Sequence, residues 1–373
     1  MELRPVVRLL LKSFGALIVA CVAMLAILAL IPASTPMIYG ANAIASLQAV
    51  RIENVDQWLL MRGYDRSNPV LLYLHGGPGF AFIPFARKFS SRLEEHFVVV
   101  HWDQRGAGKS CSSEVSDESL QLEQYLADTL DLVQWLRSRF GVEKIYLLGH
   151  SWGNVLGVLT VQRHPDLFQA YIGLGQVVNQ RRGEELSYRF AVDRAKAEGN
   201  DEALERLRTI QPPYRSLKEL ILQRSWLGHY RGSLHGGGGV SRLLSAVLMS
   251  SEYSLMDKAS YYGCFLNSTE RAWFDLEGID FIRSVRRLEV PVYFFTGRHD
   301  YNTPFELVVE WAEVLEAPHV EVASKTNWST ASLRRRWPAR HVVDARAAAA
   351  EPRSVGRRQE PASGEGNHHV RSV

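Results

Sequence analysis

The pentapeptide Gly149-His150-Ser151-Trp152-Gly153 constrains the fold of this chain more than any other stretch. It follows an apolar run at 145–148 and precedes a helix-like run at 154–159, so it predicts a sharp turn between a strand and a helix. In such a turn the serine is strained, and a glycine two residues to either side leaves room for the neighbouring chain. The Ser151 hydroxyl would stand clear of the sheet, beside amides at a helix start that favour an oxyanion. An ordinary glycine-rich turn is the alternative interpretation.

Two further glycine-rich loops each follow a predicted buried strand. The strand at 69–74 leads into the loop HGGPG at 75–79, where the backbone can approach a ligand closely. The strand at 97–102 leads into DQRGAGKS at 103–110. The glycine spacing of this second loop is reminiscent of a phosphate cradle, but the pattern G-x-x-x-x-G-K-[ST] is absent, so a nucleotide site is not expected.

The motifs HGGPG, DQRGAGKS and GHSWG, in this order and spacing, resemble those of the proline iminopeptidase group within the α/β-hydrolase fold. The resemblance spans about residues 50 to 320 and implies a mostly parallel eight-stranded sheet, helices on both faces and a helical cap. It also implies that the main-chain amides of Gly77 and Trp152 form the oxyanion hole. Related esterases and amidases share these motifs, so the resemblance specifies the serine chemistry better than the substrate.

The acid of the triad is expected after a later strand. The apolar run 290–297 supplies that strand and Arg298-His299-Asp300 supplies the turn, so Asp300 is the candidate. The alternative is an ordinary turn or helix-capping role for this aspartate. For Asp103 and Arg105 the resemblance implies a structural ion pair that braces the loop beside the site.

The chain lacks an obvious catalytic histidine. The resemblance places this base about 25 to 35 residues after the acid, and the sequence has no histidine there. His319 comes too early and His341 is the nearest later candidate, ahead of His368 and His369. Two hypotheses follow: His341 folds back to serve as the base, or the triad is incomplete because a shifted reading frame or altered gene end replaced the native terminus.

The composition of the C-terminal tail supports the second hypothesis. Residues 321–373 contain ten Lys plus Arg and five Asp plus Glu, and no Leu, Ile, Phe, Tyr or Met follows Leu333. Such a segment buries too little apolar area to offset its ordering entropy, so disorder is expected. The expected divisions are an N-terminal segment at 1–35, hydrolase core at 36–179 and 288–322, helical cap at 180–287 and basic tail at 323–373.

An uncharged apolar run extends from Phe14 to Ile31. At about 1.5 Å per residue a helix of this length reaches roughly 27 Å, close to the thickness of a bilayer core. Basic residues precede the run at 4, 8 and 12, and the next one is Arg51, so the hydrolase domain is expected outside the cytoplasm. An uncleaved anchor is favoured; a signal peptide cut near residues 41–43 and a buried helix of a soluble domain are the alternatives.

The cap is expected to select the substrate. An aminopeptidase must bind a charged amine, for which Glu184 and Glu185 are candidates at the cap entrance and Glu270 further on, although surface solvation is the alternative for each. Aromatic residues of the cap could hold a proline ring or simply pack the cap interior: Trp226, Tyr230, Tyr253 and Trp273.

Three functions follow from these expectations. The first is release of N-terminal proline from short peptides, the second is hydrolysis of an uncharged ester or amide at a membrane, and the third is a catalytically dead protein. No cofactor, metal or nucleic-acid partner is expected, since no metal-ligand spacing or strong basic bias appears. The oligomeric state is open. A bridge between Cys111 and Cys264 is conceivable outside the cytoplasm, but their spacing does not establish it.

Overall fold

The structure is a computed structural model. It describes residues 11, 13–20, 23, 24, 27, 31–233, 239–325 and 370–372. The candidate histidines His341, His368 and His369 therefore lie outside the described residues, as does most of the predicted tail.

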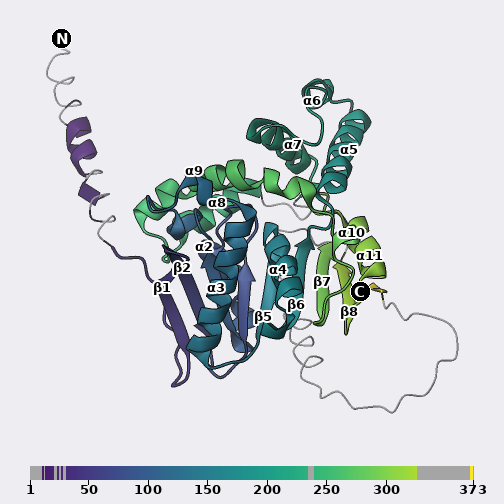
Figure 1. The fold of residues 1–373 in the computed structure, drawn as a ribbon. Helices are drawn as coiled ribbons and strands as arrows, with labels where there is room; N and C mark the ends of the chain where they lie inside the picture. Colours follow the sequence, from purple (N-terminus) through teal and green to yellow (C-terminus); the bar gives the residue numbers. More distant parts are fainter. Residues whose placement is uncertain are drawn as a thin grey trace, which may run out of the picture.

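A single twisted sheet forms the centre of the molecule (Figure 1). Its strand order is β1-β2-β4-β3-β5-β6-β7-β8-β9. The strands are β1 (Ile44–Ile52), β2 (Val55–Gly63), β3 (Val70–Leu74), β4 (Val98–Asp103), β5 (Ile145–Ser151), β6 (Phe168–Gln176), β7 (Val292–Gly297), β8 (Val320–Lys325) and β9 (Val370–Ser372). The β1–β2 and β2–β4 pairs are antiparallel and all other pairs are parallel. The mostly parallel eight-stranded sheet is confirmed, and the short β9 adds a ninth strand beside β8.

Helices cover both faces of the sheet, which explains why the central strands are apolar along their whole length. Every residue of β3, β4 and β7 is buried, as expected for strands with a packed layer on each side. On one face pack α3 (Leu122–Phe140), α4 (Trp152–Arg163), α10 (Phe281–Ser284) and α11 (Phe305–Val314). On the other face pack α2 (Ile83–Phe89) and part of α8 (Gly239–Met249).

The long connection between β6 and β7 is helical and lies above the carboxyl ends of the strands (Figure 1). Its helices before α10 are α5 (Gln180–Glu198), α6 (Asp201–Leu207), α7 (Leu217–His229), α8 and α9 (Leu255–Ala272). The first three form a lobe with its own small core, in which Ala191, Leu207 and Tyr214 are buried. The α9 helix runs across the top of the sheet, so the lobe and α9 enclose the space above the strand ends.

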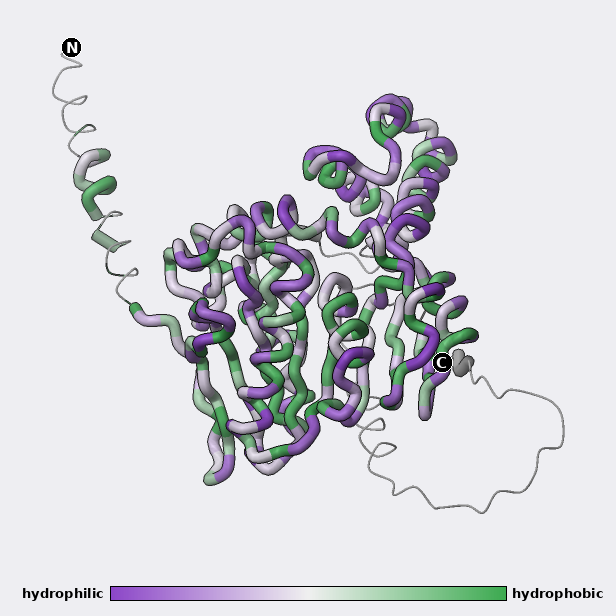
Figure 2. The backbone as a smooth tube through the Cα atoms, viewed as in Figure 1, coloured by the Kyte–Doolittle hydropathy of each residue, from purple (hydrophilic) through white to green (hydrophobic). Residues whose placement is uncertain are grey.

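At the N-terminus, residues 13–20 are helical and exposed, and they project away from the sheet (Figure 2). Within the residues that the structure describes, no helix is both long and apolar enough to cross a membrane. The predicted anchor Phe14–Ile31 lies partly outside those residues, so its spanning role stays a prediction. At the other end, β8 continues to Lys325, and β9 pairs with it in parallel.

Candidate active site

Ser151 occupies a strained turn at the junction of β5 and α4. Its backbone φ is +52° and its ψ is −117°, which is unusual for a residue with a side chain. A Cβ on Gly149 would lie 2.7 Å from the backbone of Asn154, and one on Gly153 would lie 2.2 Å from the carbonyl oxygen of Leu74. Only glycine therefore fits at either position. The predicted elbow and its cause are present in the structure.

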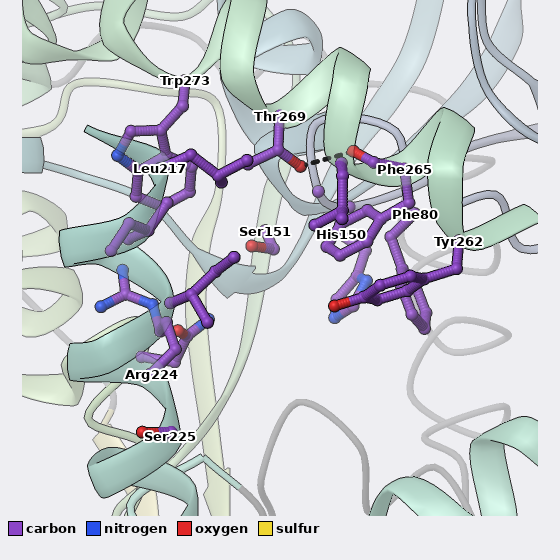
Figure 3. A pocket seen from close by; sticks show the side chains of 16 residues that line it. Phe80, His150, Ser151, Leu217, Arg224, Ser225, Tyr262, Phe265, Thr269 and Trp273 are labelled. Atoms are coloured by element: carbon purple, nitrogen blue, oxygen red, sulfur yellow. Dashed lines mark hydrogen bonds between the residues drawn. The ribbon is translucent and has the colours of Figure 1, made fainter.

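A cavity of about 480 Å³ opens above Ser151 (Figure 3). The core contributes the loop after β3 and the elbow, while the cap contributes α7 and α9, and most of the lining is apolar. The lining residues are Gly76, Gly77, Phe80, His150, Ser151, Leu217, Leu220, Ile221, Arg224, Ser225, Tyr262, Phe265, Leu266, Thr269, Trp273 and Asn302. The serine side chain is thus offered to a space large enough for a small ligand.

The two expected oxyanion donors lie on opposite sides of Ser151 in sequence and beside it in space. Gly77 lines the cavity with a φ of +123°, a value that favours glycine. Trp152 is the first residue of α4, so its amide belongs to the positive end of that helix. A Cβ on Gly76 would lie only 3.2 Å from the Ser151 Cβ, which shows how closely the glycine loop packs against the serine.

A buried hydrogen-bond network connects the three sequence motifs. The Gln104 amide donates to His75 Nε2 at 3.1 Å, and the Gln104 side chain donates to the His75 carbonyl at 3.2 Å. The Trp152 indole donates to Gln104 Oε1 at 3.0 Å. Burial lowers the pKa of His75 to about 4, so this ring is neutral and accepts at Nε2. Sequence reasoning missed Gln104, whose role depends on contacts between distant loops.

Asp300 lies in the turn after β7, where it was predicted. It is 2% exposed, and its Oδ1 accepts hydrogen bonds from the amides of Asn302 at 2.9 Å and Thr303 at 3.1 Å. Asn302, two residues further on, lines the cavity together with Ser151. The structure therefore brings the turn that contains Asp300 to the cavity, and the amide contacts give Asp300 the turn-forming role considered as the alternative.

Neither His319 nor His150 is placed as the expected base. His319 precedes β8 and pairs with Glu321 at 3.6 Å. His150 lines the cavity, and neither ring nitrogen has a hydrogen-bond partner within the described part of the chain. Burial lowers the pKa of His150 to about 4, which keeps its ring neutral. Its position next to Ser151 on the elbow directs it toward Phe80 and Tyr262 rather than toward the serine hydroxyl (Figure 3).

Comparisons with known proteins decide the family. A family model described as the alpha/beta hydrolase fold matches residues 69–203. A Bacillus subtilis protein named probable aminopeptidase YbaC is 34% identical over 284 residues, which make up 76% of this chain and 89% of that protein. The chain belongs to the α/β-hydrolase family.

Other relatives match shorter stretches of this α/β-hydrolase. A probable proline iminopeptidase of Leptolyngbya boryana is 30% identical over 37% of this chain and 38% of its own length. Among solved structures, VinJ has a TM-score of 0.57 at 16% identity, covering 82% of this chain and 98% of VinJ. A proline iminopeptidase of Mycobacterium smegmatis has a TM-score of 0.53 at 18% identity, covering 82% and 95%. At these identities the structural matches show the shared fold alone.

The two predicted amine-binding carboxylates of this hydrolase differ in position. Glu184 is buried behind the cavity wall, where it pairs with Arg224, whose Nη1 lies 2.9 Å from Glu184 Oε2. Arg224 lines the cavity, and its guanidinium lies 5.3 Å from the centre of the Trp273 ring. Glu185 is exposed on the outer side of α5 and does not reach the cavity, because adjacent residues of a helix point in different directions.

Among the aromatic residues predicted for the cap, only Trp273 lines this cavity. Trp226 and Tyr230 pack in the core of the lobe, and Tyr253 is buried beside Asp103. The rings that do line it are mostly ones that sequence reasoning did not select, namely Phe80, Tyr262 and Phe265. Within the described residues no group of His, Cys, Asp and Glu side chains could hold a metal ion.

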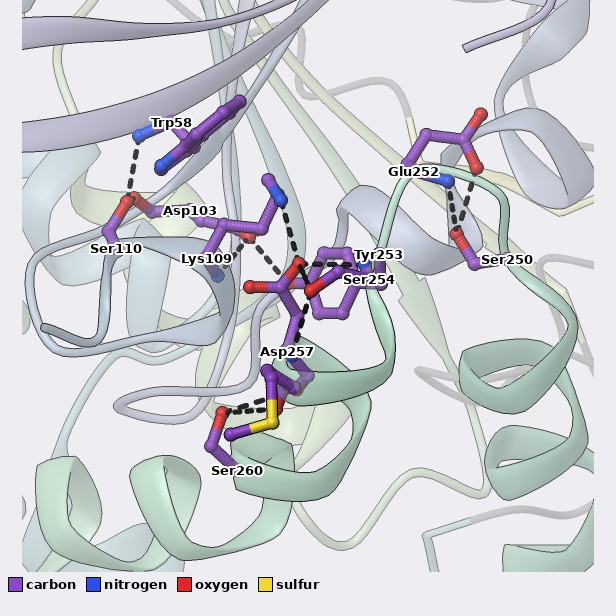
Figure 4. Close-up of polar contacts among 11 residues, drawn as sticks. Trp58, Asp103, Lys109, Ser110, Ser250, Glu252, Tyr253, Ser254, Asp257 and Ser260 are labelled. Carbon is purple, nitrogen blue, oxygen red and sulfur yellow. Dashed lines mark hydrogen bonds and ion pairs between the residues drawn. The ribbon is translucent and has the colours of Figure 1, made fainter. Parts of the chain in front are cut away.

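The expected ion pair between Asp103 and Arg105 is wrong. Arg105 pairs instead with Asp128 of α3, with Nη2 at 2.6 Å from Oδ1. Asp103 accepts hydrogen bonds from the Tyr253 hydroxyl and, at 3.0 Å, from the Lys109 amide (Figure 4). Burial raises the pKa of Asp103 to about 7, although these two donors act to lower it. Asp103 ends β4 and Arg105 lies in the loop after it, so the strand geometry does not place the two side chains together and each finds a partner elsewhere.

A disulfide joins the core to the cap. Cys111, in the loop after β4, bonds to Cys264 of α9, and their Cα atoms are 6.1 Å apart. Close by, Ser268 donates to the Gly106 carbonyl at 2.9 Å and Thr269 donates to the Pro78 carbonyl at 2.9 Å. These contacts hold α9 against the glycine-rich loops, so α9 forms a fixed roof over Ser151. The spacing of the cysteines left this bond open, and the structure contains it.

Proposed function

We propose that this α/β-hydrolase cleaves acyl bonds by nucleophilic attack of Ser151. The observation that carries the proposal is the strained elbow, with φ at +52°, which presents Ser151 to the cavity between the Gly77 loop and the start of α4. The Ser151 Oγ would add to the substrate carbonyl, the amides of Gly77 and Trp152 would hold the resulting oxyanion, and the leaving group would depart with a proton. Water would then hydrolyse the ester on Ser151 and restore the hydroxyl.

The base and acid of the triad complete this proposal. We assign Asp300 as the acid, because it is buried in a turn that borders the cavity. No base is assigned: the tail composition favours an incomplete triad, and His341, outside the described residues, is the nearest candidate if a base is present. A chain without a base would keep a protonated, weakly nucleophilic serine and only the catalysis that the oxyanion hole and binding provide.

Peptides are the first proposed substrates, and N-terminal proline is the first residue to test. The relatives named as aminopeptidase and proline iminopeptidase support this choice, and the apolar rings of the cavity suit a proline ring. Recognition of the free amine would fall to Glu184. Because Glu184 is paired with Arg224, its carboxylate would have to turn away from Arg224 toward the ligand, or attract the ammonium group from its present position.

An uncharged ester or amide is the second candidate, and the pairing of Glu184 favours it. Because Glu184 already binds Arg224, the described cavity lining offers no carboxylate for an ammonium group. A neutral acyl group would need no such partner and would still gain from the apolar lining. The two candidates therefore differ in whether Glu184 contributes to substrate binding.

Substitution of the two neighbouring glutamates separates these substrates. Turnover of a proline arylamide and of a neutral aryl ester would be measured for Glu184→Gln and for Glu185→Gln, its exposed matched control. A peptidase predicts a KM for the arylamide raised about tenfold or more in Glu184→Gln alone, since a charge-assisted hydrogen bond contributes about 1.5 to 3 kcal/mol. Ester turnover without arylamide turnover in the unchanged chain would support the second candidate. Ser151→Ala should abolish both activities.

We further propose that Phe14–Ile31 anchors the chain in a membrane, with the hydrolase domain outside the cytoplasm. The absence of charge from this run and the basic residues before it support the anchor and its direction. The Cys111–Cys264 disulfide supports the location, because such bonds persist mainly in oxidising compartments. Protease protection of the hydrolase domain in sealed spheroplasts, rather than its digestion, would contradict this orientation.

A further inference from the structure

The first residues of the hydrolase domain are hydrogen-bonded to the cap as well as to the sheet. The Ser34 amide donates to the Ser251 carbonyl at 2.9 Å, and the Thr35 hydroxyl donates to Glu252 Oε1 at 3.1 Å. Arg62 of β2 binds the same segment through the Thr35 hydroxyl and the Pro36 carbonyl, both at 2.7 Å. The chain that follows the apolar run is therefore fixed at the connection between α8 and α9.

This connection is flanked by exposed apolar side chains, which we name the cap rim: Leu244, Leu248 and Met249 of α8 and Met256 of α9. Their exposed fractions are 56%, 56%, 84% and 70%. Leu244 and Leu248 are one helical turn apart, and Met249 and Met256 lie at the two ends of the connection. Exposed apolar groups gathered in this way are costly in water and mark a contact surface.

The two carboxylates beside the rim, Glu252 and Asp257, are each paired with a basic side chain. Glu252 pairs with Arg87 at 2.5 Å. Asp257 pairs with Lys109 at 2.7 Å (Figure 4). The rest of the connection consists of Ser250, Ser251 and Ser254 and the buried Tyr253. The carboxylates of Glu252 and Asp257 are therefore paired. Unpaired negative charge at this place would repel an anionic lipid surface.

We propose that the cap rim docks on the surface of a lipid bilayer and that the N-terminal apolar run holds it there. The step from Ile31 to Ser34 spans at most about 11 Å, even when fully extended. If the run ends at the bilayer surface near Ile31, the Ser34–Ser251 hydrogen bond brings the rim to that surface. Because the segment from Ile31 to Ser34 is short, the cap and not the opposite end of the sheet is the face that meets the lipid.

Docking at the rim has a consequence for the active site. Tyr262 lies six residues after Met256 on α9, about 9 Å along the helix. It is 62% exposed and also lines the cavity above Ser151, so α9 contributes to both the cap rim and the cavity. Docking at the rim would therefore place the end of α9 that precedes the cavity at the bilayer surface. This inference rests on the proposed anchor and is independent of the bond that Ser151 cleaves.

Spin labels on the full chain test the docking. Single cysteines would replace Met249 or Met256 in a Cys21→Ser background, labelled without reductant so that the Cys111–Cys264 bond stays intact. Lys144→Cys is the matched control, because Lys144 is exposed just before β5, at the end of the sheet opposite Ser151. The labelled chain would be placed in vesicles of phosphatidylcholine and phosphatidylglycerol, and collisions with oxygen and with a water-soluble nickel chelate would be measured.

The expected result is an oxygen-to-nickel collision ratio several-fold higher at Met249 and Met256 than at Lys144. Equal access of the nickel chelate to all three positions in the vesicle-bound chain would overturn the docking. Spin–spin broadening at Met249 would also overturn it, because this would show that a second copy of the chain covers the rim. Failure of the full chain to float with the vesicles would overturn both anchor and docking. Fluorophosphonate labelling of Ser151 in the same sample reports the hydrolase function separately, since that reaction does not require lipid contact.

Discussion

At the residue scale, the elbow illustrates how a local motif can encode a site. The sequence predicted that glycines must flank Ser151, and the structure gives the reason in contacts of 2.7 Å and 2.2 Å for the missing Cβ atoms. Because these constraints act between residues close in sequence, or between the elbow and the adjacent strand, the pattern GHSWG was sufficient to find them.

Gly153→Ala should destabilise the fold. The added Cβ would meet the Leu74 carbonyl at 2.2 Å, and the adjacent strand cannot move away without breaking its pairing with β5. We expect a loss of about 2 kcal/mol or more in the free energy of unfolding, measured by urea denaturation. Gly263→Ala in α9, where a Cβ meets nothing within 4 Å, is the control and should be neutral or slightly stabilising. Equal stability of the two variants would contradict the packing described for the elbow.

His75 should make the stability of the fold depend on pH. Burial lowers its folded-state pKa to about 4, below the ordinary value of about 6.5, so the unfolded chain binds a proton more readily between these values. The stabilising contribution of the neutral ring is present above pH 6.5 and is lost as the pH falls toward 4, by at most about 3 kcal/mol. Urea denaturation from pH 4 to 7 would show this slope, and His75→Gln should reduce it. An unchanged slope in the variant would mean that other groups cause the pH dependence.

At the element scale, strand and helix order was predictable and long-range pairing was not. Apolar runs and their turn residues identified β3, β4, β5 and β7, because buried parallel strands are apolar along their length. The partner of Arg105 could not be found in this way, since Asp128 lies on α3 and meets Arg105 only after the helix packs. Glu184 and Arg224 are likewise 40 residues apart and pair through the packing of α5 on α7.

The disulfide should stabilise the roof of the cavity. Reduction, or Cys111→Ser with Cys264→Ser, would remove a link between residues separated by 153 positions and leave α9 held only by hydrogen bonds and ion pairs. We expect a loss of about 2 to 4 kcal/mol, seen as a lower Tm by circular dichroism. The double variant serves as the control for the reductant, because it should not respond further. A Tm unchanged by reduction in the unsubstituted chain would contradict a stabilising role for the bond.

At the scale of the whole molecule, the fold reaches as far as β8 and β9 while the expected base is not among the described residues. The sequence already located this gap, since the stretch after Asp300 that should carry a histidine has none. Residues 1–320 could not identify the base, because the resemblance places the base in the loop after the last strand and not in the motifs before it.

His341→Ala tests which hypothesis about the tail is right. We expect turnover to stay within about twofold of the unsubstituted chain, because an incomplete triad leaves catalysis that depends on the oxyanion hole and binding. The rate would be measured with the most reactive aryl ester that the chain turns over. A fall of about 100-fold or more would assign His341 as the base and would contradict the incomplete triad.

The most direct measurement for the whole account is the site of covalent modification by a fluorophosphonate. The full chain would be incubated with the probe for an extended time, digested and mapped by mass spectrometry, with Ser151→Ala as the control. The account predicts one phosphonylated residue, Ser151, because among the hydroxyls that the structure describes this one combines the strained elbow with the amides of Gly77 and Trp152. Modification at another serine, or a chain that stays unmodified, would contradict it.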